Sequence, residues 1–212
     1  MKERPILFSG PMVRAILEGR KTQTRRAIKF EWCSSREALM HQAAFDPAYK
    51  CPYGKPGDRL WVRETWGMSF EDIVPTGRQF VSGGTWGSPS RPNRKPCVVF
   101  RADGDMPDDS PGETATWCPS IHMPRWVSRI TLEIVSVRVE RLNDISASDC
   151  KAEGIQIPRC GCEVCATQSI ICTADAGEYV MAYRELWESI NGVDSWETNP
   201  WVWVIEFKEV KP

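Results

Sequence analysis

Apolar and polar residues alternate in several short stretches of the chain, which is the pattern of β-strands whose side chains point to opposite faces. The longest stretch is 129–141, where Ile130, Leu132 and Ile134 share one parity and the valines from Val135 onward share the other. This change of parity indicates a bulge or a strand buried on both faces. Shorter runs predict further strands at 5–8, 22–28, 59–64, 97–100 and 201–207.

Three stretches instead follow the helical period. Residues 12–18 form the first, and Ser146 followed by Gly154 marks the start and end of the second, over 145–153. The third covers 175–190 and has an apolar stripe made of Val180, Tyr183, Leu186, Trp187 and Ile190. Strands outnumber helices in this order, so we expect an α+β fold with a mixed, partly closed β-barrel and flanking helices.

The chain has 212 residues, of which 42% are apolar, enough to support the core of one domain. We therefore expect a single domain over 1–212. Segments that are rich in Gly, Pro or Ser, or that lack periodic apolar positions, are expected to be loop insertions within it. They lie at about 30–53, 66–95 and 103–118, with a Cys-rich insertion at about 156–174. Most of the ten Trp residues are expected in the core, and one or two as platforms for a stacked base.

The formal net charge is −1, which gives no overall positive field to attract nucleic acid. Basic residues nevertheless gather between Arg14 and Lys29, with Glu18 as the nearby acid. Such a patch suits one phosphate or one nucleotide, and a solvated charged face is the alternative. The sequence has no secretory signal pattern and no apolar run of about 20 residues, so we expect a cytoplasmic protein without a membrane partner.

The centre of this basic region is the run Gly-Arg-Lys-Thr-Gln-Thr-Arg-Arg at 19–26. It lies where the first helix gives way to the second strand. In an ideal strand Lys21, Gln23 and Arg25 share one face, and Thr24 lies on the other with Arg26. Amine, hydroxyl and guanidinium groups so close together predict a polar pocket.

Four cysteines are clustered at Cys160, Cys162, Cys165 and Cys172. Thiolates at this spacing in a reducing compartment predict a structural zinc site, in which all four or only three of them are ligands. A loop with free thiols, or a disulfide formed in air, is the alternative. No organic cofactor is expected.

The 19–26 motif resembles the signature of ASCH domains, which belong to the PUA-like superfamily. Other stretches resemble the same family: Gly57-Asp58 before a strand, the long strand at 130–141, and 145–154 leading into a helix. The terminal Trp-Val-Trp-Val-Ile-Glu-Phe strand completes the resemblance. It extends to ASCH proteins of bacteriophages and prophages, which implies a bacterial host cell.

The resemblance implies recognition of RNA or of a modified nucleoside. A small bacterial branch of the family is similar to amidohydrolases that remove the acetyl group of N4-acetylcytidine. Carried onto this chain, the working residues of that branch are Lys21, Thr24 and Glu153. This chain is longer than those enzymes and has inserted loops.

Amide hydrolysis requires a nucleophile, a proton carrier and a means of stabilising the oxyanion. Thr24 supplies the hydroxyl or positions a water, and Lys21 accepts the proton if its pKa is lowered by burial and neighbouring arginines. Glu153 holds the ammonium or passes a proton to the leaving amine. The alternative is that Lys21 and Glu153 form an ion pair that only ties a helix to a strand.

Further residues near strand ends and turns are candidates for contacts with a base or a phosphate. They are Arg20, Arg25, Arg26, Glu64, Trp66, His122 and Arg125. Two other functions stay open on the sequence. One is a non-catalytic phage module that binds RNA or a modified base, and the other is a ribonuclease.

Overall fold

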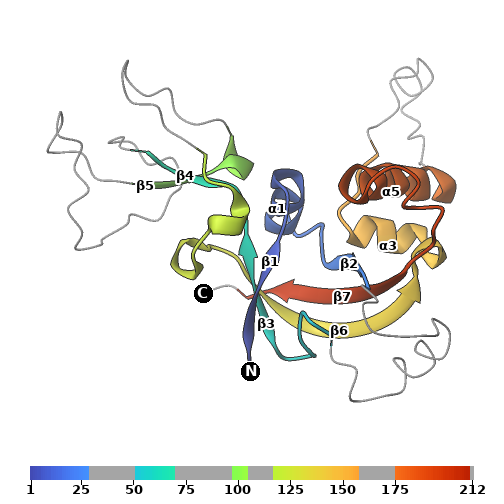
Figure 1. The fold of residues 1–212 in the computed structure, drawn as a ribbon, viewed down its shortest axis with the longest axis horizontal. Coiled ribbons are helices and arrows are strands. Elements are labelled where there is room, and N and C mark those ends of the chain that lie inside the picture. The colour runs from blue at the N-terminus through green and yellow to red at the C-terminus, as the bar shows by residue number, and fades with distance from the viewer. Residues whose placement is uncertain (29–50, 70–96, 105–116, 158–174, 211–212) are drawn as a thin grey trace, which may run out of the picture. The chain divides into compact units, whose positions relative to one another are not determined.

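The computed structural model describes residues 1–28, 51–69, 97–104, 117–157 and 175–210 (Figure 1). The long strand and the helices lie close to where the alternation and the helical period place them. In chain order the elements are β1 (Glu3–Leu7), α1 (Gly10–Leu17), β2 (Gln23–Ala27), β3 (Arg59–Arg63), β4 (Trp66–Ser69), β5 (Cys97–Phe100), η1 (Arg101–Asp103), η2 (Ser120–His122), η3 (Arg125–Val127), β6 (Thr131–Arg141), η4 (Leu142–Asp144), α3 (Ala147–Ala152), α5 (Ala176–Asn191) and β7 (Trp201–Glu209).

Five strands form one mixed sheet in the order β1-β3-β6-β7-β2, and β4 and β5 form a second sheet. β1 and β3 are parallel, whereas β2 pairs with β7 in antiparallel register, with Thr24 opposite Ile205. The expected α+β class is confirmed. The described part of the chain contains an open sheet and no closed barrel.

By their contacts the residues fall into two compact units, and each is described by itself. The first unit consists of Met1, Ala15–Asp58 and Glu133–Lys208. In it α3 and α5 lie side by side (Figure 1). Its apolar core is made of Leu142, Ile145, Cys150, Tyr183, Trp187, Trp196, Val202 and Val204.

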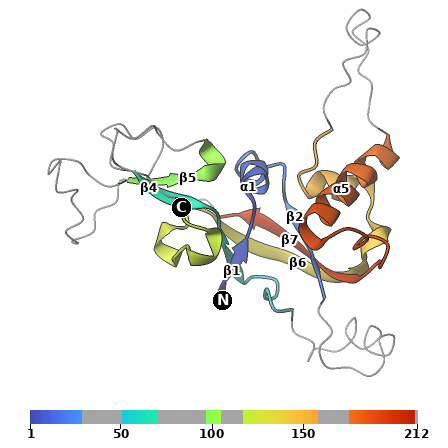
Figure 2. The ribbon, with the colours of Figure 1, turned by 45° about the horizontal axis from the view of Figure 1, so that its top comes forward.

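The second unit consists of Lys2–Arg14, Arg59–Leu132 and Glu209–Pro212. It contains the antiparallel β4–β5 pair, visible in Figure 2, so the segment that begins at Trp66 starts as one strand of a pair, as the weak-hairpin alternative to a long loop predicts. Much of the expected insertion at 66–95 lies outside the described residues, as does most of 30–53, 103–118 and 156–174. The core of this unit is made of Trp66, Val98, Phe100, Met123 and Val127.

Both predicted helix starts in the C-terminal half are capping boxes. The Ser146 hydroxyl accepts a hydrogen bond from the Asp149 N–H, and Asp175 and Glu178 satisfy each other's backbone donors in the same way. Two apolar positions differ from expectation. Ile190 is 55% exposed although it belongs to the predicted stripe, and Val135 is 51% exposed, so β6 is not buried on both faces there. No helix among the described residues is long and apolar enough to cross a bilayer.

Gly154 allows the chain after α3 to pass close to the turn before β2. Its φ is +91°, and a Cβ placed there would lie 3.0 Å from the Ala15 Cβ and 3.2 Å from the Lys21 Cβ. We expect Gly154→Ala to lower the free energy of unfolding by about 2–4 kcal/mol, through backbone strain and the steric contact together. Urea denaturation measures this loss.

Gly192 is the matched control, because its φ is +99° and nothing lies within 4 Å of a Cβ there. Gly192→Ala therefore introduces strain alone and is expected to cost about 1–2 kcal/mol. Equal losses in the two variants would show that close packing against Lys21 is not what requires Gly154.

Candidate functional site

Lys21 lies in the turn between α1 and β2, and not in the strand itself. Gly19 has a φ of +72°, after which the Lys21 N–H donates to the Ala15 carbonyl at 2.9 Å. The next residue, Thr22, donates to the carbonyl of Ala152 at the end of α3. These bonds bring the start of β2 against the end of α3. Since Lys21 precedes the strand, the alternation of β2 does not decide which way its side chain points. The side chain points toward the end of α3.

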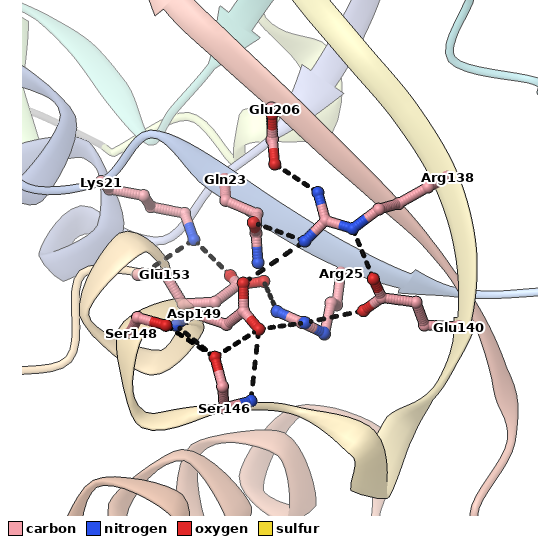
Figure 3. Close-up of polar contacts among 10 residues, drawn as sticks. All are labelled: Lys21, Gln23, Arg25, Arg138, Glu140, Ser146, Ser148, Asp149, Glu153 and Glu206. Carbon is pink, nitrogen blue, oxygen red and sulfur yellow. Dashed lines mark hydrogen bonds and ion pairs between the residues drawn. The ribbon is translucent and has the colours of Figure 1, made fainter.

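Lys21 and Glu153 form a buried ion pair. The Lys21 Nζ lies 2.7 Å from Oε2 of Glu153 and also donates to the Glu153 carbonyl oxygen at 2.9 Å (Figure 3). The two side chains are 0% and 3% exposed. Glu153 is the C-cap of α3, and its N–H donates to the Asp149 carbonyl. The structure therefore brings together two of the three residues that the resemblance placed in the site.

Burial is the largest influence on the Lys21 amine, and it lowers the pKa of Lys21 below its ordinary range. The charge and hydrogen bond of Glu153 act in the opposite direction, while the positive charges of Arg26 and Arg25 lower the pKa further. The net effect is an amine that gives up its proton more readily than an exposed lysine does. Such an amine, held against a carboxylate, is equipped for proton transfer.

Arg25 lies on β2 with its side chain fully buried. Its Nη2 lies 3.0 Å from Oε2 of Glu140 and 3.3 Å from Oδ2 of Asp149, and its Nη1 lies 3.6 Å from Oε1 of Glu153. Partial burial acts to raise the pKa of the Asp149 carboxyl, but hydrogen bonds from Ser146 and the charge of Arg25 outweigh it, so that the pKa is lowered.

A second guanidinium, that of Arg138 on β6, joins the same group of acids. It pairs with Glu140, Asp149 and Glu206, and it donates to the Gln23 Oε1 at 3.2 Å (Figure 3). Lys21, Gln23 and Arg25 thus all reach this group, as predicted for one face. We call the following residues the polar cluster: Lys21, Gln23, Arg25, Arg138, Glu140, Asp149, Glu153 and Glu206. Its three basic and four acidic side chains give it a net charge of about −1 at neutral pH.

Thr24 is 3% exposed and lies in β2, opposite Ile205 of β7. Since Gln23 and Arg25 both point into the polar cluster, strand alternation directs Thr24 to the other face of the sheet. The structure thus shows the pair of Lys21 and Glu153, whereas a role for the Thr24 hydroxyl stays a prediction. Arg20 lies near the surface, where it pairs with Glu18 and donates to the Gly154 carbonyl at 3.0 Å.

The remaining candidates lie in the second unit. Glu64 is 1% exposed, and burial raises the pKa of its carboxyl although the Arg129 guanidinium opposes this. Arg129 binds both oxygens of Glu64, at 2.9 and 3.0 Å, and both oxygens of Asp103. Trp66 is a core residue of this unit, and His122 is exposed in η2.

Arg125 also belongs to the second unit. It pairs with Glu3 at 3.0 Å and donates to the Thr131 hydroxyl. Its guanidinium carbon lies 5.9 Å from the centre of the Trp61 ring. The guanidinium of Arg125 is therefore already paired with a carboxylate of its own unit.

Sequence reasoning missed three of the four acids of the polar cluster: Glu140, Asp149 and Glu206. Two signals were present in the chain. Asp149 stands three residues after Ser146, which is the spacing of a capping box. Arg138 and Glu140 share one parity of a strand, so that they project from the same face.

The predicted zinc ligands Cys160, Cys162, Cys165 and Cys172 lie outside the described residues, and the part of the chain that is described contains no metal-ligating group of His, Cys, Asp and Glu. Cys150 lies in the core of the first unit. Burial raises the pKa of its thiol to about 11, so it stays protonated and is a poor nucleophile.

Comparisons with protein-family models, with curated proteins and with solved structures give no match to this chain. What the site can do is therefore argued from its residues. A lysine with a lowered pKa beside a carboxylate indicates proton transfer. A cluster with more acids than bases disfavours an anionic ligand.

The buried pair predicts a specific pattern of stabilities. Removal of one partner leaves an unpaired buried charge, so Lys21→Met and Glu153→Leu are each expected to lower the free energy of unfolding by about 3–5 kcal/mol. The double variant leaves neither charge and is expected to lose less than either single variant. Chemical denaturation of the four proteins measures this cycle.

Lys208 and Glu133 provide an exposed pair of the same chemistry, 3.0 Å apart with side chains 62% and 33% exposed. Lys208→Met is expected to change stability by less than about 1 kcal/mol. If the two buried substitutions were simply additive in the double variant, the pair would not be the coupled unit described here.

Proposed function

We propose that the polar cluster is the proton-transfer centre of an amidohydrolase whose substrates are small, uncharged acylated amines of the N4-acylated cytidine type. The observation that carries this proposal is the buried Lys21–Glu153 pair, with 2.7 Å between Nζ and Oε2 and a lowered pKa of the amine. A base and an acid in contact, from segments far apart in the sequence, are what cleavage of an amide needs. The resemblance to ASCH domains supplies the substrate class.

The reaction adds water across the amide C–N bond. A water adds to the acyl carbon while Lys21, in its neutral form, accepts the released proton, because strand alternation directs the Thr24 hydroxyl to the other face of the sheet. Lys21 passes this proton to Glu153, whose Oε2 lies 2.7 Å from the Lys21 Nζ, and Glu153 delivers it to the N4 nitrogen as the C–N bond breaks. The products are a carboxylic acid and the free amino nucleoside.

The charge of the polar cluster favours a nucleoside over RNA. Arg25 and Arg138 already contact carboxylates, so their charges are neutralised before any ligand arrives. A phosphate would approach a group with more acids than bases, which is unfavourable. The RNA-binding alternative therefore has no support from this site, and Arg20 and Arg26 remain as proposed contacts to the substrate.

We also propose that the fold is that of a PUA-like ASCH domain. The mixed sheet, the basic turn before β2 and the capped α3 that supplies Glu153 are compatible with a PUA-like ASCH domain to which loops have been added. A partly closed barrel of that type would need strand pairs beyond those in the described open sheet.

The proposal is tested with purified protein and a panel of N4-acylated cytidines, with release of carboxylic acid followed by chromatography. Two variants preserve shape while removing chemistry: Thr24→Val removes the hydroxyl, and Glu153→Gln removes the acid. Glu153→Gln is expected to lower kcat/KM by about 100-fold or more, in line with the loss of a general acid. Thr24→Val is expected to change it by less than about 10-fold, because strand alternation directs Thr24 to the other face of the sheet. Lys208→Ala, which alters an exposed lysine, is the control and is expected to retain full activity.

Circular dichroism and melting temperatures must show that the variants are folded. Full activity in folded Glu153→Gln would contradict the proposed role of the pair. No product from any substrate with folded wild-type protein would reject the amidohydrolase and favour the binding module.

We also propose that Cys160, Cys162, Cys165 and Cys172 bind one structural zinc ion. A segment with little apolar content gains stability from a tetrahedral thiolate site. Elemental analysis of protein purified without added metal is expected to find about one zinc per chain. Cys162→Ser is expected to lower that content, whereas Cys150→Ser, which changes a core thiol, leaves it unchanged. Zinc-free wild-type protein with four titratable thiols in this segment would contradict the site.

A further inference from the structure

We propose that Arg25 is the positioning residue of the Lys21–Glu153 pair rather than a contact to the substrate. Its guanidinium lies between Glu153 and two other carboxylates, and it thereby fixes the orientation in which the Glu153 carboxylate faces Lys21. The inference deepens the proposed function. Its effect on rate rests on that function, whereas its effect on the Lys21–Glu153 pair does not.

The contacts of Arg25 are those of a brace between elements. Glu140 belongs to β6, while Asp149 and Glu153 are four residues apart at α3, about one helical turn, and so lie on one face of it. The fully buried guanidinium reaches all three carboxylates at 3.0 to 3.6 Å. The first two acids hold the guanidinium in place, and this fixes the position of its Nη1 beside Glu153.

The two oxygens of Glu153 consequently have different neighbours. Oε2 faces the Lys21 Nζ at 2.7 Å, whereas Oε1 faces the Arg25 Nη1 at 3.6 Å (Figure 3). Within the described residues, neither Oε1 nor Nη1 has a hydrogen-bond partner. Arg25 thus attracts Oε1 without closing a hydrogen bond on it. The carboxylate is oriented, and one oxygen keeps the capacity to carry a proton.

Arg25 also contributes to the charge around Lys21. The charged groups that act on the amine are Glu153 from α3, and Arg25 and Arg26 from β2. Tyr183 of α5 and Cys150 of α3 lie near the same acid, and burial raises the pKa of both, so that they stay neutral. Loss of Arg25 would remove one of the two positive charges that oppose Glu153 at Lys21, with Arg26 remaining, and it would free the Glu153 carboxylate to approach Lys21. Both changes raise the pKa of Lys21.

The chain offers a matched control in Arg138. Like Arg25 it pairs with Glu140 and Asp149, at 3.3 Å for the Asp149 Oδ1. In the part of the chain that the structure describes, it forms no ion pair with Glu153. Substitution of either arginine removes one positive charge from beside Glu140 and Asp149. Substitution of Arg25 also removes the contact with Glu153.

The first experiment needs no substrate. Lysine labelled with 13C at Cε is titrated by NMR, and the Lys21 signal is identified as the one that is missing in Lys21→Met. Arg25→Gln is expected to move the titration of Lys21 to higher pH by about one pH unit or more, the size expected for loss of a charge a few ångströms away in a partly buried site. Arg138→Gln is expected to move it by clearly less. Equal shifts in the two variants, or none in Arg25→Gln, would overturn the proposal.

Arg25→Lys covers the case in which Arg25→Gln does not fold. The lysine keeps the charge, but its single ammonium cannot span three carboxylates. With an N4-acylated cytidine as substrate, Arg25→Lys is expected to lower kcat about 10-fold with little change in KM, because orientation contributes to the reaction step. Arg184→Lys, at an arginine that pairs with Glu188 and Glu197 outside the polar cluster, is expected to stay within about twofold of wild type.

The outcomes separate the two proposals. A rise in KM at unchanged kcat in Arg25→Lys would make Arg25 a substrate contact and overturn the positioning role. Where Arg25→Gln is active, the rise of its rate with pH is expected to occur at higher pH than in wild type, since Lys21 must lose its proton to act. Inactive wild-type protein would reject the amidohydrolase, and the NMR titration would still decide the role of Arg25.

Discussion

The structure of the first unit depends on one constraint, which is that the ammonium group of Lys21 is buried away from water. Transfer of a charge into the protein interior is unfavourable by several kcal/mol unless a partner and hydrogen bonds replace the lost solvation. Glu153 supplies both a carboxylate and a carbonyl oxygen to Lys21. This requires α3 to end beside the turn before β2, and Gly154 permits that approach because it has no Cβ. The local geometry of three elements thus follows from one ion pair.

The arginines next to that pair show that a motif that is basic in the sequence becomes part of a mixed-charge cluster when the chain folds. In the sequence, 19–26 is a concentration of positive charge. In the structure, Glu140 and Asp149 bring carboxylates to Arg25, and Arg138 joins them from β6. The result is a compact alternation of charges in which each guanidinium contacts acids from more than one element. Such a network has strict geometric requirements, and these suit it to hold a reactive pair in one orientation.

The sequence predicted what local rules determine. Alternation located β6 and β7, capping residues located the starts of α3 and α5, and the resemblance brought Lys21 together with Glu153. Glu140, Asp149 and Glu206 were missed because their gathering around Arg25 and Arg138 depends on the tertiary fold, as in Arg25 and Glu140, which are 115 residues apart. Exposure also depends on the tertiary neighbours of a residue, so periodicity placed Ile190 in a stripe whose end the fold leaves open to solvent.

Stability alone gives no reason for Lys21 and Glu153 to be where they are. Two apolar side chains of similar volume would fill the same space without any loss of solvation, and replacements of this kind are often neutral or stabilising. Burial also lowers the pKa of the Lys21 amine, although the charge and hydrogen bond of Glu153 act to raise it. A residue that is costly to bury and poised to lose its proton is typical of a reaction centre. In this respect the burial of the ion pair is an observation that the proposed proton transfer accounts for and that fold stability alone does not.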